Sequence, residues 1–299
     1  MWKRHLALLT AFVLTVSLFI APLKASAVEQ DVIDEKLGVP IVVYGANLSA
    51  DEKARVQQSL NVGDDVEEHV VTGQELVKYI PDGNPNARMF SSVKITRQDA
   101  GKGLDIRIVT PNDITQVTSS MYATAMATAG VEDAIVEVAA PKPVTGHSAL
   151  VGIYKAYEVT GGVLDTERTD VANDELNLAT KLADDAGVDE DRITQLLTEI
   201  KQQIGEQKPA TKEDVERIVK EQLEKLDIQL SEEDRQLLID LMDRIRGLNI
   251  DFDKISDQLG DLSSKLKEKI DNIDPGFWED VKQFFRNLWE KIRSFFAKE

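Results

Sequence analysis

Of the three histidines in this 299-residue chain, His69 and His147 lie outside the apolar N-terminus and best suit proton transfer or metal binding. His147 is followed by Ser148, but neighbouring residues on a helix point apart, so these two do not form a nucleophile–base pair. Each histidine precedes or opens a helix that starts at Val-Thr-Gly, and the two could approach each other across a sheet. They define one alternative function, a hydrolase with its site near His69 and His147.

Two Thr-Gly pairs could also contribute to a binding site. Thr72-Gly73 and Thr145-Gly146 are expected to open helices, whose free backbone N–H groups could bind an anion. Two-residue matches carry little specificity. We therefore expect both threonines to cap their helices.

An acidic cluster surrounds Gly187, but its spacing differs from the alternating acids of a calcium loop. We expect one helix to end at this glycine and Asp189 to cap the next. The cluster comprises Asp184, Asp185, Asp189, Glu190 and Asp191.

The chain contains no cysteine, which excludes disulfides, thiolate catalysis and cysteine-ligated zinc. It has no glycine-rich phosphate loop, nucleophile elbow or zinc-protease helix. We therefore expect neither a metal nor a cofactor.

The C-terminal stretch 276–299 has the clearest binding pattern. At 100° per residue its apolar side chains fall in one arc of roughly 140°, which no charged residue enters before Glu299. Seven of the 17 Phe, Trp and Tyr residues of the chain lie here, and Lys and Arg border the arc on both sides. This is the pattern of a helix lying in a lipid headgroup layer. The arc comprises Phe277, Trp278, Val281, Phe284, Phe285, Leu288, Trp289, Ile292, Phe295 and Phe296.

The same pattern also suits a helix that packs on its own protein or on a second subunit. Pro275-Gly276 separates the stretch from the preceding chain. The sequence thus leaves four surfaces open for the arc: a membrane surface, an envelope protein, another copy of this chain in a homo-oligomer, and the body of the chain itself.

The N-terminus has the form of a secretory signal peptide over residues 1–27. Lys3 and Arg4 precede an apolar stretch, and Ala25-Ser26-Ala27 is a small-x-small cleavage site. The alternative is an uncleaved anchor, because the apolar stretch could nearly span a bilayer. We expect a secreted protein or one held at the extracytoplasmic cell surface.

The charge of the chain argues against nucleic acid as a partner. The formal net charge is −18, and it becomes −21 without the signal, which carries three cations and no acid. Nucleic-acid binding needs clustered cations. The stretch 276–299 carries +1, so the near-neutral segment is the one with the apolar arc.

Periodicity and turn signals predict an α+β chain. The first half is expected to hold strands at 40–45, 66–71, 91–97, 104–110 and 134–139, and helices at 49–60, 72–80, 114–129 and 145–159. The third and fourth strands flank Ala100–Gly103 and are predicted to form a hairpin. The order β-α-β-α occurs twice, over 40–80 and 105–158, which predicts two related units that share one sheet about a pseudo-twofold.

From residue 161 the sequence changes to charged helical segments, punctuated by glycine and proline. These predict an all-helical half over 161–274, after an α/β domain over 28–160 and before the amphipathic helix of 275–299. The helices are expected at 165–186, 189–204, 212–226, 232–248 and 252–273.

Several stretches resemble a secreted bacterial family, domain of unknown function 1002. They are YGANLSADEKARVQQSLNV at 44–62, MYATAMATAGV at 121–131 and AGVEDAIVEVAAPKPVTGHSALVGIYKAYE at 129–158. The most specific piece is GIYKAYE at 152–158. The resemblance implies export, a mixed α/β half and a helical C-terminal half, and it adds no catalytic residues.

The sequence thus favours an exported cell-envelope protein that binds or has a structural role without catalysis. It would dock on a membrane or a partner through its C-terminal helix. The hydrolase near the two histidines is the alternative.

Cleavage is expected after Ala27, because Ala-Ser-Ala fits signal peptidase specificity. Export of the full chain from a bacterial host, followed by N-terminal sequencing, should give a first residue of Val28. A sequence that starts at Met1 would instead identify a retained anchor.

Overall fold

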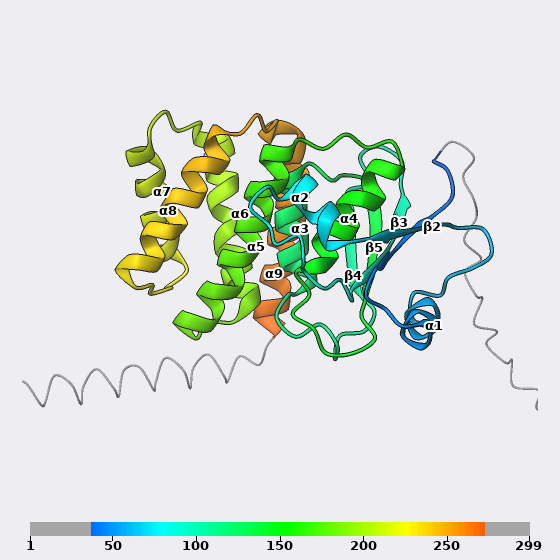
Figure 1. The fold of residues 1–299 in the computed structure, drawn as a ribbon. Helices are drawn as coiled ribbons and strands as arrows, with labels where there is room; N and C mark the ends of the chain where they lie inside the picture. The colour runs from blue at the N-terminus through cyan, green and yellow to red at the C-terminus, as the bar shows by residue number, and fades with distance from the viewer. Residues whose placement is uncertain (1–36, 273–299) are drawn as a thin grey trace, which may run out of the picture. The chain divides into compact units, whose positions relative to one another are not determined.

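The structure is a computed structural model that describes residues 37–272. Its strands form one sheet: β1 (Ile41–Gly45), β2 (Glu67–Val71), β3 (Ser92–Arg97), β4 (Leu104–Ile108) and β5 (Ala134–Ala139). Helices interleave with them: α1 (Ala50–Ser59), α2 (Gly73–Tyr79), α3 (Ser119–Ala129) and α4 (Ser148–Val159). Helices alone follow, as far as the structure describes: α5 (Thr166–Ala186), α6 (Glu190–Gln207), α7 (Lys212–Lys225), α8 (Glu232–Gly247) and α9 (Phe252–Asn272). The predicted α+β fold is confirmed (Figure 1).

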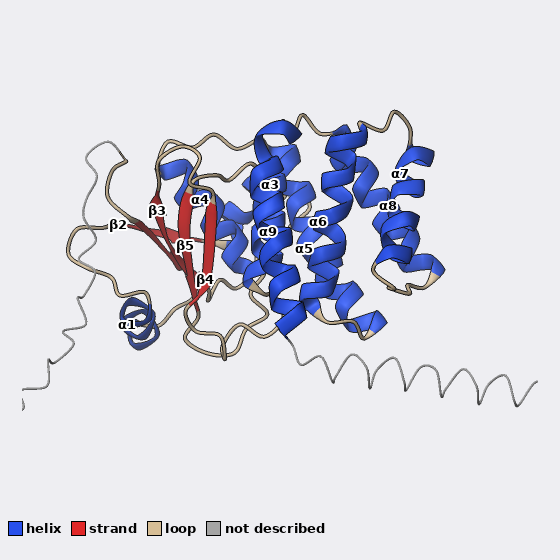
Figure 2. Ribbon diagram, turned by 180° about the vertical axis from the view of Figure 1, so that it is seen from behind, coloured by secondary structure: helices blue, strands red, loops and turns tan. Residues whose placement is uncertain are grey.

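The sheet is mixed, with the strand order β2-β1-β3-β5-β4 (Figure 2). β1 pairs in parallel with β2, and β5 pairs in parallel with β4. The central β3 is antiparallel to both of its neighbours. The other four strands therefore point the same way, and their carboxyl ends lie at one end of the sheet.

The predicted hairpin is wrong, because β5 lies between β3 and β4. β5 has the sequence AIVEVA and pairs along its whole length with β3, so its buried backbone is hydrogen-bonded on both edges. The connection 98–103 crosses two strand spacings, about 10 Å, which six residues span easily at about 3.3 Å each. The glycines near Lys102 thus serve a crossing loop and not a tight turn.

Two β-α-β-α units are present, as β1-α1-β2-α2 and β4-α3-β5-α4, and each pairs its strands in parallel. The expected pseudo-twofold is wrong. A twofold through β3 would exchange β1 with β5, yet β1 is the first strand of its unit and β5 is the second strand of its own. The connection from β3 to β4, which crosses β5, sets this arrangement because it places β4 at the edge.

Helices α3 and α4 start later than predicted, for one shared reason. Ile114 forms a parallel bridge with Val144. Around it, Thr115 N donates to Val144 O at 2.9 Å and Val144 N donates to Asp113 O at 2.9 Å. This pairing holds both segments extended, so α3 begins after Thr118 and α4 after His147. Thr145 therefore does not cap α4, contrary to expectation.

The two faces of the sheet are covered unequally. One face carries Val43, Val93 and Val138 side by side and packs against α3 and α4. These residues belong to the largest cluster of buried apolar side chains among the described residues, which we call the main core. The other face packs on α1 through Val42 and Tyr44. No described helix covers this second face over β5 and β4 (Figure 2).

The helical layer continues the main core from the sheet as far as α8. α5 and α6 pack on α3, and α9 runs along α6. The predicted helix starts at Ser49, Asp189 and Ser231 are confirmed, since each side chain accepts a hydrogen bond from a backbone N–H of the first turn.

A buried ion pair joins α5 to α6 beside α3. Lys201 Nζ donates to Glu175 Oε1 at 2.7 Å, to Thr124 O at 2.7 Å and to Thr128 Oγ1 at 3.1 Å. Glu175 also accepts from the hydroxyls of Thr124 and Thr128. Both charged side chains are fully buried. Burial lowers the pKa of Lys201, and the Glu175 carboxylate opposes that shift.

Replacing Lys201 with Met should destabilise the fold by about 3–5 kcal/mol, because it leaves the Glu175 carboxylate buried without a cation. The double variant Lys201→Met/Glu175→Gln, which also removes the negative charge, should recover part of that loss. Urea denaturation followed by circular dichroism measures both. A single variant within about 1 kcal/mol of the wild type would contradict this account of the pair.

Candidate functional site

The two histidines have separate partners. His69 lies on the edge strand β2, and its Nε2 is 2.8 Å from Glu67 Oε1. His147 precedes α4, and its Nε2 is 3.5 Å from Thr180 Oγ1 on α5. The Thr180 hydroxyl also bonds to Asn177 O of its own helix at 2.9 Å. The structure therefore gives the histidines no shared partner.

Burial lowers the pKa of His147, because the imidazolium would lose hydration. A neutral imidazole could accept a proton, but Thr180 is a buried helix residue whose hydroxyl follows the ordinary back-bonding pattern. Within residues 37–272, no group of three His, Asp or Glu side chains could hold a metal.

The Thr72 prediction is confirmed. Its hydroxyl accepts from Glu75 N at 3.2 Å, and Glu75 accepts from Thr72 N at 3.0 Å. The acidic cluster is also explained by helix ends: Gly187 ends α5 at φ 61°, and Asp189 accepts from Asp191 N at 3.0 Å. These residues terminate and start helices.

The carboxyl ends of parallel strands commonly hold a ligand in α/β proteins. Here the loop before β3 closes the end of β1: a Cβ added to Gly45 would lie 2.3 Å from Met89 O. Lys142, which follows β5, lies 3.9 Å from the centre of the Phe90 ring and 2.9 Å from Glu52. These contacts join the loops across the place where a ligand would bind.

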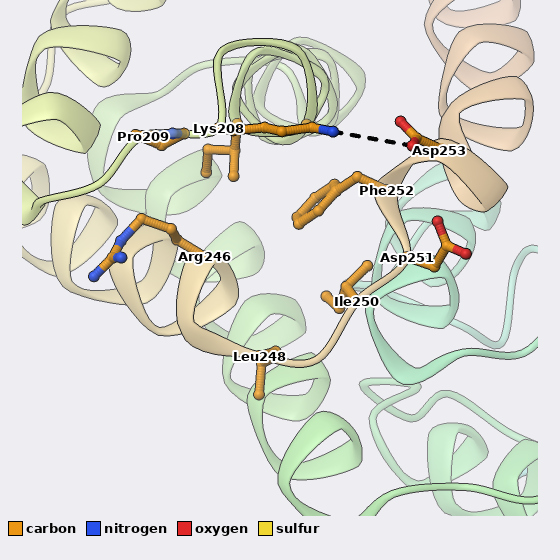
Figure 3. A pocket seen from close by; sticks show the side chains of 10 residues that line it. Lys208, Pro209, Arg246, Leu248, Ile250, Asp251, Phe252 and Asp253 are labelled. Carbon is orange, nitrogen blue, oxygen red and sulfur yellow. Dashed lines mark ion pairs between the residues drawn. The ribbon is translucent and has the colours of Figure 1, made fainter.

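A hollow of about 310 Å³ lies where α6, α8 and α9 meet (Figure 3). Its charged residues already have partners. Lys208 is 4.0 Å from Asp253, and Arg246 donates to Asp243 at 2.8 Å. Asp251 accepts from Lys254 N at the start of α9. The charges here therefore serve helix ends and leave no unpaired group for a ligand.

A second hollow, of about 330 Å³, differs in this respect. We call it the edge groove. It lies between the edge strand β4 and α9, with Ala123 and Ala127 of α3 among its lining residues. Its charged residues are Lys102, Asp105, Arg107, Asp261 and Lys265.

Arg107 pairs with Asp105 in the edge groove, and its NH2 lies 2.6 Å from Asp105 Oδ2. Lys102 and Lys265 have no ion-pair partner in the part of the chain that the structure describes. No sequence pattern predicted this groove. Its two walls are about 155 residues apart in the sequence, and no local sequence signal connects residues at that separation.

The ten apolar residues of the predicted C-terminal face, Phe277 to Phe296, lie outside the described residues, as does the signal peptide. The described surface exposes few large apolar side chains. They are Val70 on β2, Val77 on α2, Val163 in the loop before α5 and Leu237 on α8. These four belong to four different elements.

A mixed five-stranded sheet with helices interleaved, continued by a helical layer, defines the class as an α+β protein. Residues 44–262 match the family described as Protein of unknown function (DUF1002), and the chain belongs to that family. It is 34% identical over 239 residues to the uncharacterized protein YpuA of Bacillus subtilis (strain 168), which covers 78% of this chain and 81% of that protein. No solved structure matches the chain. The predicted resemblance is confirmed.

The lowered pKa of His147 predicts a loss of stability in mild acid. The unfolded chain binds this proton near the ordinary pKa of about 6.5, whereas the folded chain binds it only at lower pH. The contribution of neutral His147 is therefore present above about pH 6.5 and is lost as the pH falls through the folded pKa.

His147→Gln should therefore lose less unfolding free energy than the wild type between about pH 7.5 and about pH 5.5. Urea denaturation at the two pH values measures the difference, and His69→Gln on the edge strand is the matched control. An unchanged pH dependence in His147→Gln would contradict the prediction.

Proposed function

We propose that the protein is an exported, extracytoplasmic protein that acts by binding and not by catalysis. Its folded body carries a C-terminal helix that docks on a membrane surface. The proposal of export rests on the signal-like residues 1–27. The proposal of docking rests on the apolar arc in residues 276–299.

One observation carries the proposal: the described body exposes only four large apolar side chains, on four different elements. Burying even half of the ten arc residues is worth several kcal/mol, at about 1.5–3 kcal/mol for each large side chain. Such a gain requires a continuous apolar partner, which a lipid surface supplies.

The end of α9 supports the same proposal. Leu266 and Ile270 are buried, and Lys269 pairs with Asp191 at the start of α6. The last described turns of α9 are thus fixed to the body. None of the described helices is long and apolar enough to cross a membrane.

Charge is compatible with docking at an anionic surface. Apart from the signal and residues 276–299, the chain carries −22, while the C-terminal stretch carries +1. Repulsion of the acidic body is screened beyond about 8 Å at physiological salt. The near-neutral stretch can therefore contact lipid while the body remains in solution.

The test is a triple variant, Trp278→Glu/Phe285→Glu/Trp289→Glu, in the full exported chain. It should abolish flotation with vesicles of phosphatidylglycerol and phosphatidylethanolamine, because three charges enter the apolar arc. Circular dichroism and urea denaturation should show an intact body.

The matched control is Gln283→Glu/Asn287→Glu/Ser294→Glu, which adds the same charge opposite the arc on a helical wheel and should retain flotation. Equal flotation of both variants would overturn the membrane proposal. So would a wild type that stays unbound to vesicles and is instead a homo-oligomer in sedimentation, or binds only an envelope protein. Unfolding of the first variant would show that the arc packs on the body.

A further inference from the structure

We infer that the edge groove between β4 and α9 binds an extended, acidic peptide segment, which adds as a strand to the free edge of β4. This site is independent of the C-terminal helix.

The backbone of β4 leaves hydrogen-bonding groups at this edge. Ala134 N donates to Gly103 O at 3.1 Å, and Val109 N donates to Val138 O at 2.9 Å. Because strand residues alternate, the odd-numbered residues of β4 face β5, and Leu104, Ile106 and Ile108 turn their N–H and C=O groups outward. No strand in the described range pairs with this edge. A row of such groups is a template for strand addition.

The groove has the shape for one strand and not for a second sheet. α9 stands beside β4 at this edge (Figure 2), and its Gln258, Leu262 and Lys265 form the facing wall. The small side chains of Ala123 and Ala127 leave space between the walls. A volume of about 330 Å³ lies at the lower end of ligand sites, so it suits a few residues of one chain. A second copy would have to bring its own sheet past α9.

The side-chain amide nitrogen of Gln258 in the groove lacks a hydrogen-bond partner among the described residues. This Nε2 atom is buried. A buried amide donor of this kind is costly unless it finds an acceptor. A backbone carbonyl of an added strand supplies one after a small rotation of this half-buried side chain.

Charge selects the peptide. The groove holds three cations and two acids, which gives +1 in a chain of −18. Arg107 and Asp105 neutralise each other. Lys102 and Lys265, on opposite walls, have no ion-pair partner among residues 37–272, and together with Asp261 they give the net charge of +1. Both ammonium groups are exposed, so they contact acidic side chains at the rim and leave the backbone contacts to β4. An acidic strand between them meets a cation on each side.

The test uses the full chain and the C-terminally amidated peptide EVDVE, which carries an uncharged fluorophore on its N-terminal amine for fluorescence anisotropy. The peptide should bind, and hydrogen exchange of the Leu104, Ile106 and Ile108 amides should slow. Two peptides serve as controls. KVKVK reverses the charge, and EVDVE with N-methylated valines keeps the charge but removes backbone donors. Both should bind at least about tenfold more weakly.

The protein variant is Lys102→Glu/Lys265→Glu, which should weaken EVDVE binding about tenfold, mainly at low salt. Lys267→Glu, an exposed cation on the same helix and outside the groove, should leave binding unchanged. The inference is overturned if EVDVE does not bind, if it binds without protecting residues 104–108, or if N-methylated EVDVE or KVKVK binds equally well.

Discussion

The fold depends on the buried contact between Lys201 and Glu175. These side chains place opposite charges where three helices meet, and desolvation makes either charge costly without the other. The Thr124 carbonyl and the hydroxyls of Thr124 and Thr128 complete their hydrogen bonds. The contact therefore fixes the position of α5 and α6 against α3, and α3 in turn packs on the edge strand of the sheet. The helical layer and the sheet become one body at this point.

Helix α9 contacts two parts of that body, α3 near the sheet edge and α6 in the helical layer. Ile255 and Leu259 pack with Ala127 of α3, so the helix returns from the helical layer to the sheet edge. The middle of α9 thereby forms a wall of the edge groove, and its last turns are tied to α6 through Lys269 and Asp191. Both proposed interactions depend on this single helix: it faces the free edge of β4, and it leads into the C-terminal stretch.

The usual ligand position of a parallel sheet is closed in this protein. Met89 lies against Gly45 at the end of β1, and Lys142 joins Phe90 and Glu52 across the neighbouring loops. The histidines that suggested a hydrolase lie apart from these contacts and have partners of their own. The two histidines therefore share no hydrogen-bond partner among the described residues.

The sequence alone determined the elements and the family, because both depend on local signals. Capping at Ser49 and Ser231, the punctuation at Gly187 and the GIYKAYE motif are short-range features, and the structure or the comparison bore them out. Strand neighbours depended on long-range contacts. The insertion of β5 between β3 and β4, and the pairing of Ile114 with Val144 that delays α3 and α4, follow from which apolar surfaces can be buried together. The edge groove and the Lys201–Glu175 pair likewise join residues 26 to about 155 positions apart, and only tertiary packing brings such residues within hydrogen-bond distance or onto facing walls.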